Sequence, residues 1–330
     1  MRNAFNGSAG KQDIASRFSN QILAMLDSGV RPWAQPWQNA DSARILRPLR
    51  SNGTPYGGIN TLMLWMSANA HGFTNPSWMT YRQAAALGGH VMKGEHGTPI
   101  VYASTLTRPE QKDGETVERK IPFMRGYKVF NVQQIEELPN RFYDPPADRL
   151  APDERIANAD EFFASTGADI HHGGNKAFYA LRDDYIRMPA FEAFNDSESY
   201  YATLAHEITH WTRHPSRLAR DFGRQKFGDE GYAKEEIVAE IGSAILCGEL
   251  DLTPEIREEN AAYIDHWRKF IREDKNFIFK AAAHAQRAAD FVISAHQPAM
   301  ERNNDHDYEV HDETPDLQPG VRREPMKPAI

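Results

Sequence analysis

Apolar residues recur at helical spacing in several stretches of the N-terminal half of the chain. One stripe predicts an amphipathic helix over residues 13–28, and a second helix is predicted over residues 61–70. A third helix would begin within residues 78–83, where Thr80 and Gln83 have the spacing of a capping box. The inward face of the first helix would consist of Ile14, Phe18, Ile22, Met25 and Leu26.

Two runs rich in Val, Tyr and Phe, residues 100–105 and 126–132, predict β-strands. We interpret the charged stretch between them, residues 108–120, as the loop of a hairpin. Helices and strands together indicate an α+β domain over residues 10–138. The stretch that follows, residues 139–154, is rich in proline and polar residues and has the composition of a linker.

Beyond this linker, periodicity predicts a helix over residues 155–166 and a two-stranded hairpin over residues 177–189. Further helices are predicted over residues 232–247 and 274–295, and Thr253-Pro-Glu would start another.

The chain is therefore expected to be an α+β protein of two domains. The second domain, residues 155–296, would be mainly helical with a small antiparallel sheet. Residues 297–330 are polar, contain several prolines and lack periodicity, as expected of a disordered tail.

The composition of the chain argues against membrane and secreted proteins. With 40% hydrophobic and 25% charged residues, the chain resembles ordinary soluble globular proteins. No run approaches the roughly 18 apolar residues of a membrane span, and the first residues lack the apolar segment of a signal peptide. Cys247 is the only cysteine, which excludes a disulfide framework. We therefore expect a cytoplasmic protein with no membrane partner.

Charge is divided unevenly along the chain. Residues 1–130 hold 15 Lys and Arg against 8 Asp and Glu, a net +7, whereas the remaining residues have a net charge of −15. Aromatic residues are interleaved with the basic ones, and this combination is typical of single-stranded nucleic-acid binding. The alternative is that most of these aromatic residues simply fill the core. The candidate DNA contacts are Arg31, Trp33, Trp37, Arg47, Arg50, Tyr56, Arg82 and Lys93.

The clearest chemical motif is His206-Glu207-Ile208-Thr209-His210. Residues four apart share a face of a helix, so His206 and His210 could bind one metal ion. Glu207 would lie about 100° around the helix, where it could hold the attacking water and act as general base. An apolar stripe supports the helix, consisting of Tyr200, Tyr201, Leu204, Ile208 and Trp211.

A catalytic zinc site usually takes a third protein ligand, which must come from further along the chain. Glu236 and Glu240 share one face of the predicted helix, so one could bind the metal while the other orients a histidine. We assign Glu236 as the ligand and Glu240 as the orienting residue, with the exchanged assignment as the alternative. Glu235 lies about 100° around this helix and is expected to be solvated. His214 is a competing ligand.

Such a site predicts a peptidase that uses one divalent ion, most commonly zinc. Glu207 would take a proton from water and pass it to the leaving amine. A donor is also needed for the oxyanion, and the sequence does not rank Tyr185, Tyr232 and His214 for this role. The strand before the metal helix could offer its edge to an extended peptide.

At this point the chain resembles ArdC-type antirestriction proteins. Residues 202–218 and 227–242 resemble their zincin-like metallopeptidase domain. The first domain resembles the single-stranded-DNA-binding domain of these proteins at residues 56–60, 78–83, 91–95 and 129–135. Arg213 stands where glycine is expected, outside the ligand positions.

The resemblance implies a protein of conjugative plasmids that protects incoming DNA from the recipient's restriction enzymes. It implies that His206, His210 and Glu236 are metal ligands and that Glu207 is catalytic. The metal would be zinc, with manganese or cobalt also accepted.

Two classes of function remain open. In the first, the protein is a peptidase that cuts a host restriction component while bound to single-stranded DNA. In the second, it protects DNA by binding or by imitating a polyanion, and the metal site is vestigial.

Overall fold

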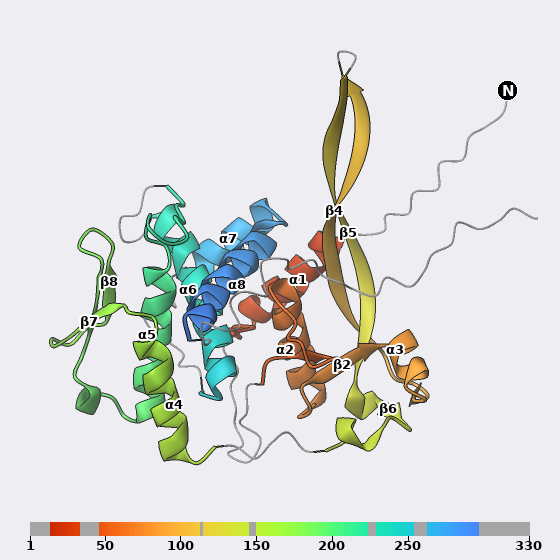
Figure 1. Ribbon diagram of the computed structural model, residues 1–330, viewed down its shortest axis with the longest axis horizontal. Helices are drawn as coiled ribbons and strands as arrows, with labels where there is room; N and C mark the ends of the chain where they lie inside the picture. The colour runs from red at the N-terminus through yellow and green to blue at the C-terminus, as the bar shows by residue number, and fades with distance from the viewer. Residues whose placement is uncertain are drawn as a thin grey trace, which may run out of the picture. The chain divides into compact units, whose positions relative to one another are not determined.

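The computed structural model describes residues 14–33, 46–112, 115–144, 150–223, 229–253 and 263–296. Its N-terminal half combines two long helices with a four-stranded sheet (Figure 1). The helices are α1 (Ile14–Asp27) and α2 (Ile59–His71). The sheet has the order β1-β2-β5-β4, formed by β1 (Leu49–Arg50), β2 (Ser77–Thr80), β5 (Glu115–Asn131) and β4 (Thr98–Lys112).

A short helix and a second sheet complete this half. Helix α3 (Tyr81–Ala86) begins at the predicted capping box, in which Thr80 accepts a hydrogen bond from the Gln83 N–H. Residues 78–80 belong to β2, so the helix begins at Tyr81, within the predicted residues 78–83. β3 (His90–Val91) pairs antiparallel with β6 (Ile135–Glu136). Between β5 and β6 lies the 3₁₀-helix η1 (Val132–Gln134), and η2 (Asn140–Phe142) follows.

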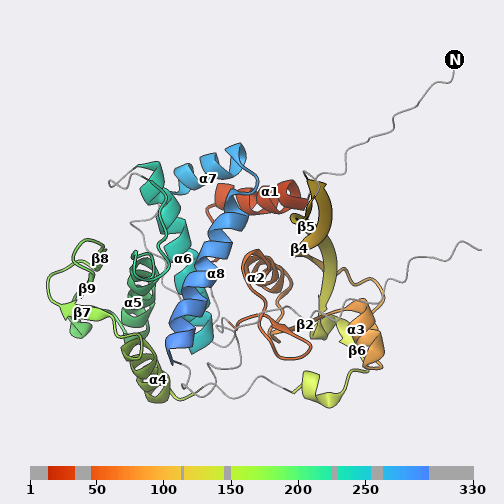
Figure 2. The ribbon, with the colours of Figure 1, turned by 45° about the horizontal axis from the view of Figure 1, so that its top comes forward.

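Strands β4 and β5 form a long antiparallel ribbon whose pairing runs from Thr98 with Val129 to Lys112 with Glu115. The interpretation of residues 108–120 as a hairpin loop was therefore wrong, because backbone pairing continues through this charged stretch. Only the base of the ribbon has a third strand, since β2 pairs with residues 129–131 of β5. Figures 1 and 2 show the ribbon extending away from the helices.

The C-terminal half is mainly helical. Its helices are α4 (Pro152–Ala164), α5 (Ser197–Trp211), α6 (Glu230–Leu250), α7 (Ile264–Glu273) and α8 (Phe277–His296). Its sheet has the order β7-β9-β8, formed by β7 (Asp169–His172), β9 (Tyr185–Met188) and β8 (Phe178–Ala180). The 3₁₀-helix η3 (Phe191–Ala193) leads from the sheet to α5.

The small sheet differs from the expected antiparallel hairpin. β8 and β9 are antiparallel as predicted, but β7 adds a parallel strand on the other side of β9. The sheet is therefore mixed. The helix expected to start at Thr253 falls mainly on residues outside the described ranges, as does the predicted tail over residues 297–330.

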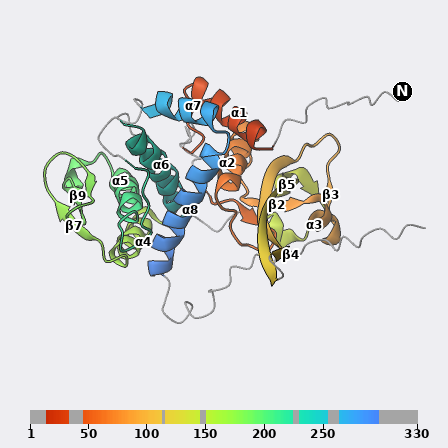
Figure 3. The same ribbon diagram turned by 90° about the horizontal axis from the view of Figure 1, so that it is seen from above.

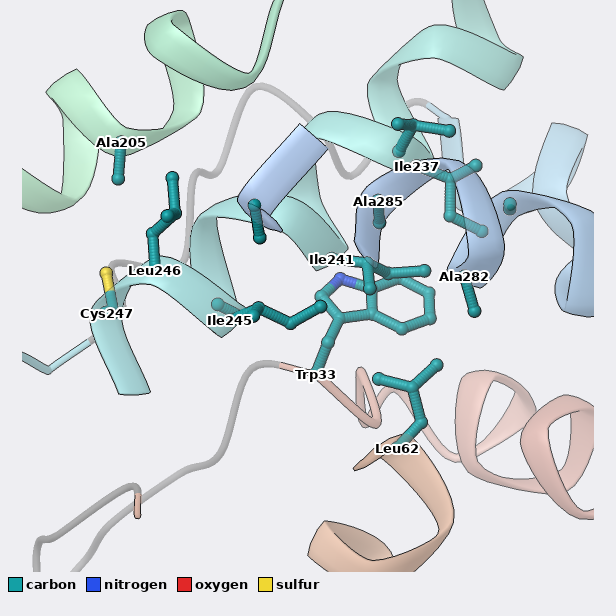
Figure 4. Packing of buried hydrophobic residues seen from close by; sticks show 14 of the residues in the cluster. Trp33, Leu62, Ala205, Ile237, Ile241, Ile245, Leu246, Cys247, Ala282 and Ala285 are labelled. Atoms are coloured by element: carbon teal, nitrogen blue, oxygen red, sulfur yellow. The ribbon is translucent and has the colours of Figure 1, made fainter. Parts of the chain in front are cut away.

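The largest core joins the N-terminal helices to the C-terminal ones. Trp33 is 1% exposed and packs with Leu62 of α2 and with Ile241 and Ile245 of α6 (Figure 4). Helix α1 lies beside α7, and α2 lies beside α8 (Figure 3). As a result, the described residues up to His296 form one compact unit. Among the helices described, none is long and apolar enough to cross a membrane.

Candidate metal centre

Helix α5 carries the two histidines of the metal motif. Asp196 caps the helix by accepting a hydrogen bond of 2.7 Å from the Ser199 N–H. Apolar residues bury α5 against α6, so the imidazole of His206 is held inside the protein and only 3% of this residue is exposed. The helix ends at Trp211, as expected from the proline that follows at position 215.

Helix α6 passes very close to α5 at a glycine. A Cβ atom on Gly242 would lie 2.5 Å from Cγ2 of Thr209 and 3.0 Å from its Oγ1. Glycine is therefore required at this contact, because any side chain would push the two helices apart. Their close approach brings Glu236 of α6 opposite the histidines of α5.

Three donor atoms converge between the helices. The Nε2 atoms of His206 and His210 are 3.1 Å apart. The carboxylate of Glu236 lies 3.5 Å from His206 Nε2 and 3.4 Å from His210 Nε2. Among the described residues, these three form the one cluster suited to a metal ion. His214 is not part of it: its Nδ1 accepts a hydrogen bond from the Ser216 N–H, 3.2 Å away.

The spacing of these donors fits a tetrahedral ion. Ligands about 2.0–2.2 Å from zinc, at the corners of a tetrahedron, lie about 3.3–3.6 Å from one another. The two Nε2 atoms are separated by nearly this distance, and each oxygen of Glu236 lies at about this distance from one histidine, Oε2 from His206 and Oε1 from His210. An ion held by one atom of each residue would keep its fourth corner for water or substrate. The imidazole and carboxylate donors also suit zinc and manganese. The ligand set that the sequence suggested is therefore brought together.

Glu207 follows the first histidine and is also buried, with 2% of the residue exposed. It follows His206 directly in the chain and is not one of the three members of the cluster. This is the sequence position that a general base takes beside a metal-binding histidine.

Glu235 does not have the solvated position expected from the sequence. It is 1% exposed, and its Oε1 accepts a hydrogen bond from His210 Nδ1 at 3.1 Å. Arg220 holds the same carboxylate with two donors, Nη2 to Oε1 at 2.6 Å and Nε to Oε2 at 2.8 Å. Glu235 thus contacts His210 through Nδ1, the ring nitrogen that does not face the cluster.

Glu240 was expected in that role, and this assignment was wrong. Its carboxylate accepts a hydrogen bond from the Trp33 indole N–H at 3.0 Å and pairs with Arg31 at 3.5 Å. Both partners come from the segment after α1. Glu240 lies four residues after Glu236 on α6, and Trp33 and Arg31 of the N-terminal segment lie against its carboxylate.

Charge in the cluster shifts the pKa values of the ligands. Burial lowers the pKa of His210, but the carboxylates of Glu236 and Glu235 outweigh burial and raise it to about 9. Burial favours the neutral form of Glu236, yet His210 and His206 hold its pKa well below the ordinary value. For Glu235, Arg220 and His210 overcome burial and lower the pKa to about 2. The metal-free cluster therefore holds a proton on His210 beside two ionised carboxylates.

Of the three possible oxyanion donors, Tyr232 is the one nearest the cluster. Burial and a hydrogen bond with Glu236 raise the pKa of Tyr232 well above its ordinary value, so its phenol remains protonated. Tyr185 instead stacks on His171, with ring centroids 4.9 Å apart.

Strand β8 is tied to the end of the metal helix by Arg217. The guanidinium of Arg217 lies 3.9 Å from the ring centroid of Trp211, and its Nε donates to the Trp211 carbonyl at 2.7 Å. It also bonds Asp184 and the hydroxyl of Tyr179, which lies on β8. The small sheet is thereby fixed against α5.

The candidate DNA contacts occupy three kinds of position. Arg31, Trp33 and Tyr56 are buried, a position that suits packing in the core better than contact with DNA. Trp37 lies outside the described residues. The remaining candidates are Arg47, which pairs with Glu249 at 2.7 Å, Arg50, which lies 5.2 Å from the Tyr56 ring centroid, and the exposed Arg82 and Lys93.

The two ligand-bearing helices and their converging donors define the C-terminal half as a zincin-like metallopeptidase fold, and residues 157–284 match the family of that description. Residues 12–130 match the N-terminal domain of anti-restriction factor ArdC. The chain belongs to the ArdC family of antirestriction proteins.

Solved structures and sequence relatives agree with this assignment. The chain is 42% identical to the metal-free antirestriction ArdC protein from the R388 plasmid, with 86% of this chain and 98% of that chain covered and a TM-score of 0.73. The Mn(II)-bound structure of that protein matches at 40% identity over 87% and 99% of the two chains, with a TM-score of 0.71. An uncharacterized protein, y4eC of Sinorhizobium fredii (strain NBRC 101917 / NGR234), is 38% identical over 88% of this chain and 94% of its own length. DNA primase TraC of Escherichia coli is 36% identical over 88% of this chain, which spans 28% of TraC.

Proposed function

We propose that this protein is an antirestriction factor that binds single-stranded DNA and hydrolyses a protein substrate at a metal site formed by His206, His210 and Glu236. The observation that carries the catalytic part is the convergence of these three residues in one cluster, with the buried Glu207 next to His206 in the chain. Protection of plasmid DNA during conjugation is the role that membership of the ArdC family suggests.

When bound, a divalent ion supplies Lewis-acid polarisation of the scissile carbonyl and makes a water molecule more acidic. The carboxylate of Glu207 takes a proton from the attacking water and then delivers it to the leaving amine. The hydroxyl of Tyr232 donates a hydrogen bond to the oxyanion of the tetrahedral intermediate. Its raised pKa supports this role, because only the protonated phenol can donate.

The strand directly before the metal helix, β9, is paired on both edges, so it cannot take a peptide as expected; an extended peptide would instead bind along β8. In the described part of the chain this strand pairs only with β9, so its other edge can accept main-chain hydrogen bonds. The attachment of β8 to α5 through Arg217 supports this placement, since it keeps the strand beside the metal helix.

DNA binding is assigned to the N-terminal half because of its positive charge and its exposed basic residues Arg82 and Lys93. The presence of a related segment in DNA primase TraC is in keeping with action near DNA.

A Glu207→Gln variant tests the catalytic part. We expect it to bind Zn²⁺ or Mn²⁺ with wild-type stoichiometry and to lose protection of an unmodified plasmid entering a restricting host. Comparing the host proteome with wild-type and with variant protein should identify peptides that appear only with the wild type. Full protection by the folded variant would instead support the alternative function, in which the protein protects DNA by binding alone.

A further inference from the structure

We propose that Glu235 and Arg220 are positioning residues that fix the orientation and tautomer of His210 for metal binding. This inference rests on the proposed metal site, but it assigns work to two residues that lie outside the ligand set. Glu235 reaches His210 from the side of the imidazole opposite the metal, through Nδ1.

The tautomer of His210 depends on the group that lies at its Nδ1 atom. A neutral imidazole that presents Nε2 to a metal must carry its proton on Nδ1, and an acceptor at Nδ1 selects that tautomer. Oε1 of Glu235 lies 3.1 Å from His210 Nδ1, while Nε2 of the same ring faces the other two donors. Arg220 donates to both oxygens of this carboxylate, which leaves a lone pair of Oε1 to accept from Nδ1.

Arg220 links His210's partner Glu235 to the end of α5. Arg220 joins the two ligand-bearing helices by using all three of its guanidinium nitrogens. Nε and Nη2 hold Glu235 of α6. Nη2 also donates to the Thr209 carbonyl at 2.9 Å, and Nη1 donates to Thr212 Oγ1 at 3.0 Å, both at the end of α5. Its side chain is 1% exposed and that of Glu235 is 2% exposed, so water does not compete for these bonds.

The network therefore ties the distance between α5 and α6 to the orientation of His210. Glu236, the third ligand, follows Glu235 directly in the chain. The carboxylate of Glu236 belongs to the metal cluster. The carboxylate of Glu235 accepts a hydrogen bond from His210 and so links α6 to α5.

The experiment compares Glu235→Gln with Glu240→Gln in the full-length chain. Both glutamates are buried on α6, but Glu240 contacts Arg31 and Trp33 instead of a ligand. Zinc affinity is measured by competition with a chromophoric chelator, and circular dichroism of the metal-free proteins verifies folding. We expect Glu235→Gln to weaken Zn²⁺ binding about 10–100-fold and Glu240→Gln to change it less than about twofold.

A spectroscopic measurement separates positioning from general destabilisation. In the zinc-loaded wild type, the His210 Nδ1–H proton should exchange slowly with water because Glu235 accepts it. A Glu235→Ala variant should lose this protection. If a single variant fails to fold, Glu235→Gln combined with Arg220→Gln keeps a hydrogen-bonded pair without charge, and the same loss of affinity is expected.

The outcomes are distinct. Wild-type zinc affinity in a folded Glu235 variant would overturn the positioning role and leave the proposed function intact. If the wild-type protein bound no zinc or manganese, both proposals would fail. If Glu207→Gln retained full protection while Glu235→Gln lost metal, the catalytic function would fail and the positioning role would stand.

Discussion

Three glutamates on one helix have three different neighbours, and those neighbours decide what each can do. Glu236 faces two imidazoles, Glu235 faces His210 and Arg220, and Glu240 faces the indole of Trp33. All three are at most 5% exposed, so each carboxylate depends on its partners for stabilisation.

At the residue scale, metal binding competes with a proton on His210. The pKa of His210 is about 9 in the metal-free site, so the ring is protonated at neutral pH and an incoming ion must displace that proton. The affinity for the metal ion therefore rises with pH up to the pKa of His210 and then levels off. We expect the zinc dissociation constant to fall about tenfold per pH unit between about pH 7 and 9.

Chelator competition across this pH range measures the slope. Calorimetry in buffers of different ionisation enthalpy should count about one proton released per ion near neutral pH. A zinc affinity that does not change with pH would contradict the prediction.

The sequence predicted that the two histidines lie together because their spacing is local. His206 and His210 are one turn apart, and a helix places such residues together wherever it lies. The roles of Glu235 and Glu240 were wrong because they depend on Arg220 and Trp33, whose positions relative to α6 come from packing between distant segments. Arg220 itself has no motif around it that would have identified it.

At the element scale, the close approach of α5 and α6 is the feature that brings the ligands together. A Gly242→Ala variant would place a methyl group 2.5 Å from Thr209 Cγ2. Separating the helices should lower the free energy of unfolding by about 1–3 kcal/mol and weaken zinc binding. Urea denaturation of the metal-free protein measures the first effect.

A second substitution distinguishes steric crowding from other causes. Thr209→Ser removes the Cγ2 methyl that the added Cβ would meet, while its hydroxyl can still donate to the Ala205 carbonyl. In the Gly242→Ala background it should recover part of the missing stability. Equal stability of Gly242→Ala and wild type would show that the two helices do not approach so closely at this glycine.

Strand propensity identified the base of the β4–β5 ribbon, where Ile100 pairs with Tyr127, but not its length. Residues 108–120 are charged, and charge at that density is typical of a loop. Strands of a two-stranded ribbon are joined by backbone hydrogen bonds, which leave no side-chain pattern in the sequence.

At the scale of the whole molecule, Trp33 tests whether the N-terminal segment supports the core or binds DNA. Trp33→Ala should lower the free energy of unfolding by about 3–5 kcal/mol, because it removes both a buried indole and the hydrogen bond to Glu240. Trp33→Phe keeps much of the ring and should lower it by about 1–3 kcal/mol. Single-stranded DNA affinity of the folded Phe variant should equal that of the wild type; a selective decrease in DNA binding would restore the stacking role.

The exposed basic residues should behave in the opposite way. Arg82→Ala and Lys93→Ala should weaken binding to a single-stranded oligonucleotide and reduce the dependence of log K on log salt by about 0.7 for each phosphate that is no longer neutralised. Stability should change by less than about 0.5 kcal/mol. Lys176→Ala, an exposed lysine of the C-terminal half, is the matched control. Unchanged affinity in both test variants would place the DNA surface elsewhere.

Composition suggested two domains joined by a linker, and the two family matches follow that division. What composition did not reveal is the shared core. Ser19 of α1 donates to the carbonyl of Lys275, which lies 256 positions away in the chain. Contacts between residues so far apart in the chain cannot be predicted from the periodicity of nearby residues.

The packing of α1 and Trp33 among the C-terminal helices also limits how this gene segment can recombine. A crossover within residues 139–154 would separate α1 from α7 and Trp33 from Glu240, leaving apolar surface exposed on both products. Recombination should therefore transfer the coding sequences of both halves together. The match to TraC extends over 308 residues and covers 88% of this chain, which is the pattern expected of a segment transferred whole into a larger protein.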